Sequence, residues 1–418
     1  NGRRLVRMLK MKLWLFCLIL MLGFSAPCTA HEATPSDPPE PGGVKSLEDR
    51  VKQLEEAMGR KPESGKWYER IQVSGLIEVE ADYQEMDYGD PAQPDADSSD
   101  VDLATVELVF DAKIAPVVDG HVMIKYEDDD LFVDEGFITL SGGDAFPAYL
   151  IAGRQYIPFG NYDSHFVTDP NTLILGETTE GAVVAGYRVG GQMVDFSAGV
   201  FNGRASETGD GDDNRIDSFV AGVTVQPLES VLFGASYTSN LASSNALSEV
   251  LADADDLDSL VGAWSAFASV EFLERYYLIA EYMAAVDDFS AGELYTADVK
   301  ARQPSAWNLE LGIALAEGLE VAARYGGSDD GADFLPESQY GVVVNWGIFE
   351  NTNLAVEYLH DEYEDDVQEA DTSIQKSDNL VEIKARGKFN RRHMVDIPRI
   401  KFFAQRRYRA NWPFLDGH

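Results

Sequence analysis

The chain has 418 residues, of which 45% are hydrophobic, and carries 72 acidic against 33 basic side chains, a formal charge of -39. A mean hydropathy of -0.21 excludes a protein built mainly from membrane-spanning helices. The negative charge excludes nucleic acid as a partner, because an acidic surface repels a polyphosphate. The length accommodates one large barrel or two to three ordinary domains.

Residues 1–30 have the pattern of a secretory signal peptide. Lys10 and Lys12 precede the apolar run Leu13–Phe24, and small residues lead to a cleavage site after Ala30. The run is too short to span a bilayer as a helix. A buried helix is the weaker alternative.

The start of translation is expected at Met8 or Met11, inside this segment. Both cysteines, Cys17 and Cys28, also lie within the predicted signal peptide. A lipoprotein signal with Cys28 as the lipidated residue is disfavoured by Pro27 before it. The mature chain is therefore predicted to have neither a disulfide framework nor a thiol catalyst.

Residues 31–65 are predicted to be a periplasmic linker followed by a short helix. Residues 31–43 are rich in proline and acid, and Ser46 can cap a helix that begins there. The 4-3-4 spacing of its apolar residues is typical of a coiled-coil seam; they are Leu47, Val51, Leu54 and Met58. The segment is either a trimer handle or a solvated amphipathic helix.

From Ile71 onward the period of the pattern changes to two, which indicates strands. In the stretch 380–389, apolar or small residues alternate with charged ones, and a terminal Phe389 closes the run. An all-charged row opposite an apolar row is expected where a strand has water on one side and lipid on the other. An edge strand of a soluble sheet is the alternative for this stretch alone.

Sixteen such runs follow one another between residues 66 and 389. Short connections alternate with long, mostly acidic ones, and only 128–131 breaks the rule. This sorting is typical of outer-membrane barrels, which have short periplasmic turns and longer outer loops. The sequence thus predicts an all-β fold: a transmembrane antiparallel up-and-down β-barrel of about 16 strands, in the outer membrane of a Gram-negative bacterium.

Closure of the barrel places the first predicted strand beside the last. The charged row of the first strand should then face the charged row of the last across the lumen wall; these rows are Glu78, Glu80 and Asp82, and Glu382, Lys384, Arg386 and Lys388. We expect Glu78 to lie close to Lys384. Residues 390–418 remain outside the barrel as a basic extension, interpreted as a read-through or frame artefact in preference to a genuine tail.

Catalytic and metal-binding patterns are not found in the sequence. None of the six histidines has the spacing of a metal pair. Residues 210–214 begin like a calcium loop, but Arg215 stands where glycine is needed and Ala221 where glutamate is needed. The sequence therefore predicts no catalytic residue, no metal site and no cofactor.

The segment 158–178 is the strongest functional candidate, because it is long and carries many apolar residues for a connection. Folding into the lumen would bury this surface and narrow the pore; packing outside against a neighbouring protomer is the alternative. Inside, its charged side chains would approach the wall at Arg154 and set solute selectivity; these are Asp163, His165, Asp169 and Glu177. The excess of acid favours cations or large solutes of positive or mixed charge.

Several stretches resemble the LbtU family of outer-membrane siderophore porins. They are Ala152–Gly160, Asp169–Thr178, Gly75–Glu80, Asp102–Leu108 and Asp134–Leu140. The resemblance implies uptake of ferric siderophore without a plug domain, through a barrel preceded by a signal peptide and a short helix. The basic tail departs from the family.

The favoured function is therefore an outer-membrane porin, with ferric siderophore or other small solutes as cargo and outer-membrane lipid and lipopolysaccharide as surroundings. A homotrimer is expected. A general or carbohydrate porin is the first alternative. The second is a structural tether between the outer membrane and the wall, which would require a closed pore.

Overall fold

The computed structural model describes residues 70–390, except 89–94, 143–145, 191–192, 209–214, 252, 255–256, 295–299, 332–333 and 364–376. The predicted signal peptide, linker and helix of residues 1–65, the acidic motif at 210–214 and the basic tail after Asn390 lie outside these ranges and stay predictions. Among the described residues, no helix has the length and apolar character needed to cross a membrane.

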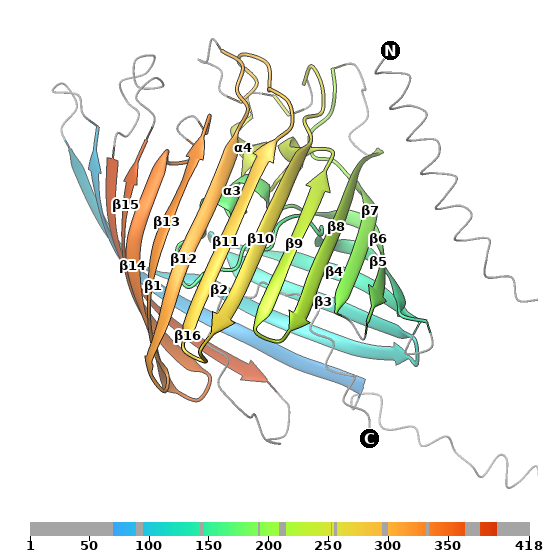
Figure 1. Ribbon diagram of the computed structural model, residues 1–418, viewed down its shortest axis with the longest axis horizontal. Helices are drawn as coiled ribbons and strands as arrows, with labels where there is room; N and C mark the ends of the chain where they lie inside the picture. Colours follow the sequence, from blue (N-terminus) through green and yellow to red (C-terminus); the bar gives the residue numbers. More distant parts are fainter. Residues whose placement is uncertain are drawn as a thin grey trace, which may run out of the picture. The chain divides into compact units, whose positions relative to one another are not determined.

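Sixteen antiparallel strands among the described residues form one closed barrel, in which each strand pairs with its neighbours in sequence and β1 pairs with β16. The strands are β1 Ile71–Asp87, β2 Ala96–Ala115, β3 Val118–Glu127, β4 Asp130–Ser141, β5 Ala148–Tyr156, β6 Thr179–Val189, β7 Val194–Asn202, β8 Ile216–Leu228, β9 Val231–Thr238, β10 Ala263–Phe272, β11 Tyr276–Ala285, β12 Ser305–Ala316, β13 Leu319–Asp329, β14 Ser338–Phe349, β15 Thr352–Glu362 and β16 Ser377–Asn390. Figure 1 shows β8 to β12 side by side in the near wall. The predicted fold class and strand number are confirmed.

The two faces of each strand follow the alternation in the sequence. On β1, Ile77 and Val79 are 46% and 41% exposed, whereas Glu78 between them is buried. On β16, Val381 and Ile383 are likewise exposed. The apolar row therefore faces outward and the charged row inward, the reverse of a soluble sandwich and the arrangement of a barrel in lipid.

The closure of the barrel matches the expected pairing. β1 and β16 run antiparallel, with Glu78 opposite Arg386 and Glu80 opposite Lys384. The Nζ of Lys384 lies 3.3 Å from Oε2 of Glu78 and also pairs with Glu80, while Arg386 pairs with Glu78. The predicted proximity of Glu78 and Lys384 is confirmed.

The connections are sorted by length as predicted. Links at one end, such as 116–117 and 317–318, are short, whereas those at the other end include 157–178 and 239–262. The exception is the two-residue turn between β3 and β4. There Asp128 and Asp129 have φ of 52° and 63°, and two successive residues of positive φ form a tight hairpin turn.

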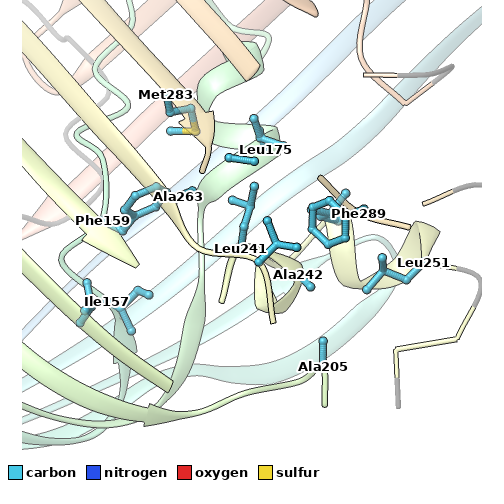
Figure 2. Close-up of a cluster of buried hydrophobic side chains, with 14 of the residues drawn as sticks. Ile157, Phe159, Leu175, Ala205, Leu241, Ala242, Leu251, Ala263, Met283 and Phe289 are labelled. Carbon is cyan, nitrogen blue, oxygen red and sulfur yellow. The ribbon is translucent and has the colours of Figure 1, made fainter. Parts of the chain in front are cut away.

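The main apolar core lies within the barrel and its longer connections. The segment 157–178, which includes helix α3 (Asn171–Gly176), packs against the connection that contains η2 (Leu241–Ser243) and α4 (Leu247–Val250). Figure 2 shows Phe159 and Leu175 from the segment gathered with Met283 of β11, Leu241 and Phe289. The segment is thereby fixed inside the barrel by ordinary apolar burial.

Replacing Lys384 tests the closure of the barrel. Lys384→Met leaves the buried carboxylate of Glu78 with one cation in place of two. We expect the free energy of unfolding to fall by about 1–3 kcal/mol, the cost of an inadequately paired buried charge. Urea unfolding in detergent, monitored by tryptophan fluorescence, measures this change in the free energy of unfolding.

The matched control is Lys113→Met. Lys113 pairs with Asp119 at 2.9 Å, but its side chain is 30% exposed. An exposed pair of this kind contributes less than about 1 kcal/mol. Equal losses for the two variants would contradict the assignment of the β1–β16 pairs as a closure interaction.

Candidate functional site

The segment between β5 and β6 lies along the inner wall of the barrel. From Gly160 to Thr168 it contacts β9, β11, β12, β13, β14 and β15 through hydrogen bonds with side chains of the wall. The first of these runs from the Gly160 N–H to Oγ of Ser236, at 2.9 Å. The segment therefore follows the wall around part of the barrel.

Glu281 of β11 binds the backbone of the first half of this segment. The backbone N–H groups of Asn161 and Tyr162 donate to its two carboxylate oxygens, both at 2.8 Å. Tyr162 adopts a φ of 58°, a conformation that costs energy in a residue other than glycine. The two hydrogen bonds to one carboxylate help to offset this strain.

Glu310 of β12 receives the middle of the segment. It accepts hydrogen bonds from Ser164 Oγ at 2.8 Å and from the His165 N–H at 2.6 Å. Arg324 of β13 contributes Nε to the same carboxylate at 3.0 Å, and both of these side chains are fully buried. The charge of Glu310 is therefore paired as well as hydrogen-bonded.

Glu357 of β15 holds the far end. It accepts from the Val167 N–H at 2.5 Å, from the Thr168 N–H at 3.0 Å and from the Thr168 hydroxyl. That hydroxyl also lies 3.3 Å from Glu382 of β16. Arg324 completes the attachment by donating to the Thr168 carbonyl oxygen at 2.9 Å.

His165 forms a charged contact at the centre of this attachment. Its Nδ1 lies 2.6 Å from Oε1 of Glu320 on β13. Burial acts to lower the pKa of His165, but the hydrogen bond and charge of Glu320, with the charges of Glu310 and Asp163, raise it more, and the net pKa is raised above 6.5. The neighbouring carboxylates therefore favour the protonated form of the imidazole.

A cavity of about 1410 Å³ remains beside the docked segment. It is lined by β16 and β1 to β5 on the wall, and by Thr168, Asp169, Leu173, Ile174 and Glu177 on the segment. The strands from β6 to β15 contribute only Thr179 from their inner faces. The cavity thus lies along one side of the barrel.

The predicted site residues fall into two groups. Arg154, Asp169 and Glu177 line the cavity. Asp163 instead accepts a hydrogen bond from Ser269 of β10 at 2.9 Å, and His165 contacts β12 and β13. The structure therefore does not bring these two side chains to Arg154; they attach the segment to the wall.

The predicted lumen wall is also placed by the structure. Six of its seven residues line the cavity: Glu78, Glu80, Glu382, Lys384, Arg386 and Lys388. Asp82 lies opposite Glu382 in the same row, next in line toward the long-connection end.

Arg154 reaches the cavity through an irregularity in β5. Gly153 has a φ of 142°, and a Cβ there would lie 2.3 Å from the Gly136 carbonyl oxygen. Its cross-strand neighbour Phe137 lines the cavity, as does Arg154 next in the chain. The backbone conformation that glycine permits here is thus found where Arg154 reaches the cavity, while the pairing of β5 with both neighbours stays in register.

The charge of the lining is strongly negative. Among the described residues, fifteen acidic and six basic side chains line the cavity, an excess of nine negative charges. In the same part of the chain, no group of three or more His, Cys, Asp or Glu side chains is arranged to hold a metal ion.

The wall carboxylates that hold the segment were not predicted from the sequence. Glu281, Glu310, Glu320 and Glu357 each occupy an inward position on a different strand. The sequence does carry one indication of them, because small residues lie close to these glutamates on the same inward-facing rows. One is Gly312, where a Cβ would lie 2.9 Å from the His165 ring. An acid next to a small residue on an inward row leaves room for a backbone segment.

No protein-family model matches the chain. The chain is similar to a UPF0422 protein of Coxiella burnetii, with 27% identity over 307 residues that cover 70% of this chain and 64% of that protein. It is also similar to the UPF0422 protein lpp3030 of Legionella pneumophila strain Paris, with 25% identity over 320 residues and coverage of 70% and 59%. The matched part of the chain spans less than two thirds of these curated relatives.

The fold is similar to solved porin structures. The outer membrane channel DcaP of Acinetobacter baumannii matches with a TM-score of 0.55 and 15% identity, over 76% of this chain and 97% of that one. An anion-selective porin from Comamonas acidovorans also matches at 0.55, with 12% identity and coverage of 76% and 99%. The chain therefore has a porin-like barrel, a fold that points to the outer membrane of a Gram-negative bacterium.

Glu357→Gln should loosen the end of the docked segment. The amide keeps only one acceptor oxygen, so one of the N–H groups of Val167 and Thr168 loses its acceptor and the other loses its charge-assisted hydrogen bond. Hydrogen bonds to a charged group contribute about 1.5–3 kcal/mol, so we expect their amide hydrogens to exchange about 10- to 100-fold faster. Hydrogen exchange read by mass spectrometry measures the change. Glu362→Gln on the same strand, with a 57% exposed side chain, is the control and should have no effect.

Stability should depend on pH through His165. Because its pKa is raised on folding, its contribution is fully present below about pH 6.5 and is lost as the pH rises through the raised value. The difference in unfolding free energy between the natural chain and His165→Gln should therefore shrink toward alkaline pH. Unfolding curves from about pH 6 upward test it. A difference that stays constant with pH would show that the imidazole is held neutral.

Proposed function

We propose that this chain is an outer-membrane diffusion channel that favours cations and solutes of positive or mixed charge, with ferric siderophore as its cargo. The supporting observation is the cavity left beside the docked segment, whose lining has fifteen acidic and six basic side chains. A water-filled constriction of this charge concentrates cations and repels anions. The proposed selectivity is opposite in sign to that named for the Comamonas porin.

The proposed selectivity filter contains Arg154 on β5 and Asp169 and Glu177 on the docked segment. Arg154 lines the cavity from the wall, and Asp169 and Glu177 line it from the docked segment. Asp169 is half-buried, so its carboxylate acts on the passage in a partly solvated setting.

The siderophore part of the proposal is supported by the resemblance of Ala152–Gly160 and Asp169–Thr178 to siderophore porins. Both stretches contribute to the cavity, the first through Arg154 and Tyr156 and the second through Asp169, Leu173, Ile174 and Glu177. A homotrimer, with outer-membrane lipid and lipopolysaccharide around it, is proposed with this function. Cross-linking of the detergent-solubilised protein tests the trimer.

Single-channel recording in a planar bilayer tests the proposed function. Under a KCl gradient the reversal potential should indicate a preference for K⁺, and ferric siderophore on one side should interrupt the current. Asp169→Asn should lower the cation-to-anion permeability ratio about four-fold, since one charge at about 10 Å in water attracts a cation by about 0.4 kcal/mol and repels an anion by as much. Glu229→Gln, in an exposed turn between β8 and β9, is the control.

The alternatives predict different recordings. Currents that siderophore does not interrupt, but sugars do, would indicate a general or carbohydrate porin. A folded barrel without conductance would support the structural tether. A preference for Cl⁻ would contradict the charge argument itself.

A further inference from the structure

The inward row of β4 has an unusual composition for a water-filled channel. From the long-connection end it reads Asp130, Phe132, Asp134, Glu135 and Phe137, and all five line the cavity. Aromatic rings thus alternate with carboxylates along one strand. An aromatic face next to negative charge is the environment that binds organic cations, because the ring quadrupole and the carboxylate attract the same positive charge.

A β-bulge produces this row. Met123 of β3 pairs with Glu135 and the next residue, Ile124, pairs with Val133, so Asp134 is the extra residue. The bulge allows two consecutive carboxylates, Asp134 and Glu135, to line the same cavity, which regular alternation forbids. Bulges commonly redirect a side chain next to a functional site.

The carboxylates of this row are held in place. The Tyr156 hydroxyl donates to Oδ2 of Asp134 at 2.8 Å, and the Arg154 Nε donates to the Asp134 carbonyl oxygen at 3.1 Å. Glu135 is 4% exposed, with its Oε2 3.4 Å from Nε2 of His121. The row is therefore rigid on the wall side.

The two aromatic rings differ in their surroundings. Phe137 stacks on the His121 imidazole, with ring centroids 4.7 Å apart and an interplanar angle of 17°. Phe132 lies opposite Lys125, whose amine is paired with Glu127 at 2.6 Å, and its ring is 36% exposed. Phe132 is thus an accessible aromatic surface near the acidic turn at 128–130.

We propose that the inward row of β4 is a binding track for organic cations that carry a flat apolar group. The positive charge is attracted by Asp130, Asp134 and Glu135. The apolar group stacks on Phe132 and then on Phe137. Leu173 and Ile174 of α3 line the same cavity and supply further apolar surface. This inference rests on the proposed function and names a chemical class within it.

Block of K⁺ current in single channels tests the track, with benzyltrimethylammonium, tetramethylammonium, benzenesulfonate and glucose as probes. We expect the aromatic cation to interrupt the current at a concentration about ten-fold lower than the aliphatic one, because both ions can make a cation–π contact but only the aromatic one adds the stacking of its own ring. Benzenesulfonate and glucose should have no effect. Block by glucose would assign the row to neutral sugars and overturn the inference.

Variants locate the effect on β4. Phe132→Leu keeps apolar volume but removes the ring, and should abolish the preference for the aromatic cation while the K⁺ to Cl⁻ ratio stays unchanged. Phe137→Leu is the second variant, and heat-dependent gel mobility checks that each barrel is folded. Phe146→Leu is the control, because Phe146 is 47% exposed in the β4–β5 connection and does not line the cavity.

The outcomes separate this inference from the proposed function. A cation-preferring channel that blocks equally with both ammonium ions would overturn the track and leave the proposed function standing. A preference for the aromatic cation that survives both ring substitutions would place the site elsewhere. A Cl⁻-preferring channel would contradict the proposed function first.

Discussion

A backbone segment buried inside a barrel needs partners for its N–H groups, and the rest of this site depends on how that need is met. Carboxylates of the wall accept them: Glu281 from Asn161 and Tyr162, Glu310 from His165, and Glu357 from Val167 and Thr168. Hydrogen bonds to a charged acceptor are stronger than neutral ones. The segment is thereby held against the wall and leaves a cavity on the other side.

The same attachment divides the acidic residues into two populations. The carboxylates on β11 to β15 that hold the segment accept hydrogen bonds from it and, at Glu310, from Arg324, and they do not line the cavity. The carboxylates of β1 to β4 do line it, where the cations of β16 balance only some of them. Part of the chain's excess negative charge is thus presented to the cavity.

Backbone irregularities are found on the wall that faces this cavity. The bulge at Asp134 and the glycine at Gly153 lie on neighbouring strands, and the bulge changes which side chains point inward. Arg154, Tyr156, Asp134 and Glu135 lie together in one region of the lining. A regular barrel would have directed some of these side chains outward, into lipid, at a high cost in free energy.

The sequence by itself determined the barrel. Period-2 alternation is a local property, so the strand number, the inward rows of β1 and β16 and the Glu78–Lys384 pair could all be read from it. The alternation of short and long connections indicated that neighbouring strands run antiparallel. For the segment 158–178 the apolar residues indicated burial and favoured inward folding, but packing outside against a neighbouring protomer stayed open.

Only the tertiary structure decided how that segment docks. Asp163, His165, Asp169 and Glu177 were equivalent candidates in the sequence, but the first two contact the wall and the last two line the cavity. The contact of His165 with Glu310 joins residues 145 positions apart, and no local pattern encodes such a distance. The bulge at Asp134 likewise depends on pairing with β3. Local periodicity specifies which face a strand presents, whereas the choice among inward side chains is made by packing between distant parts of the chain.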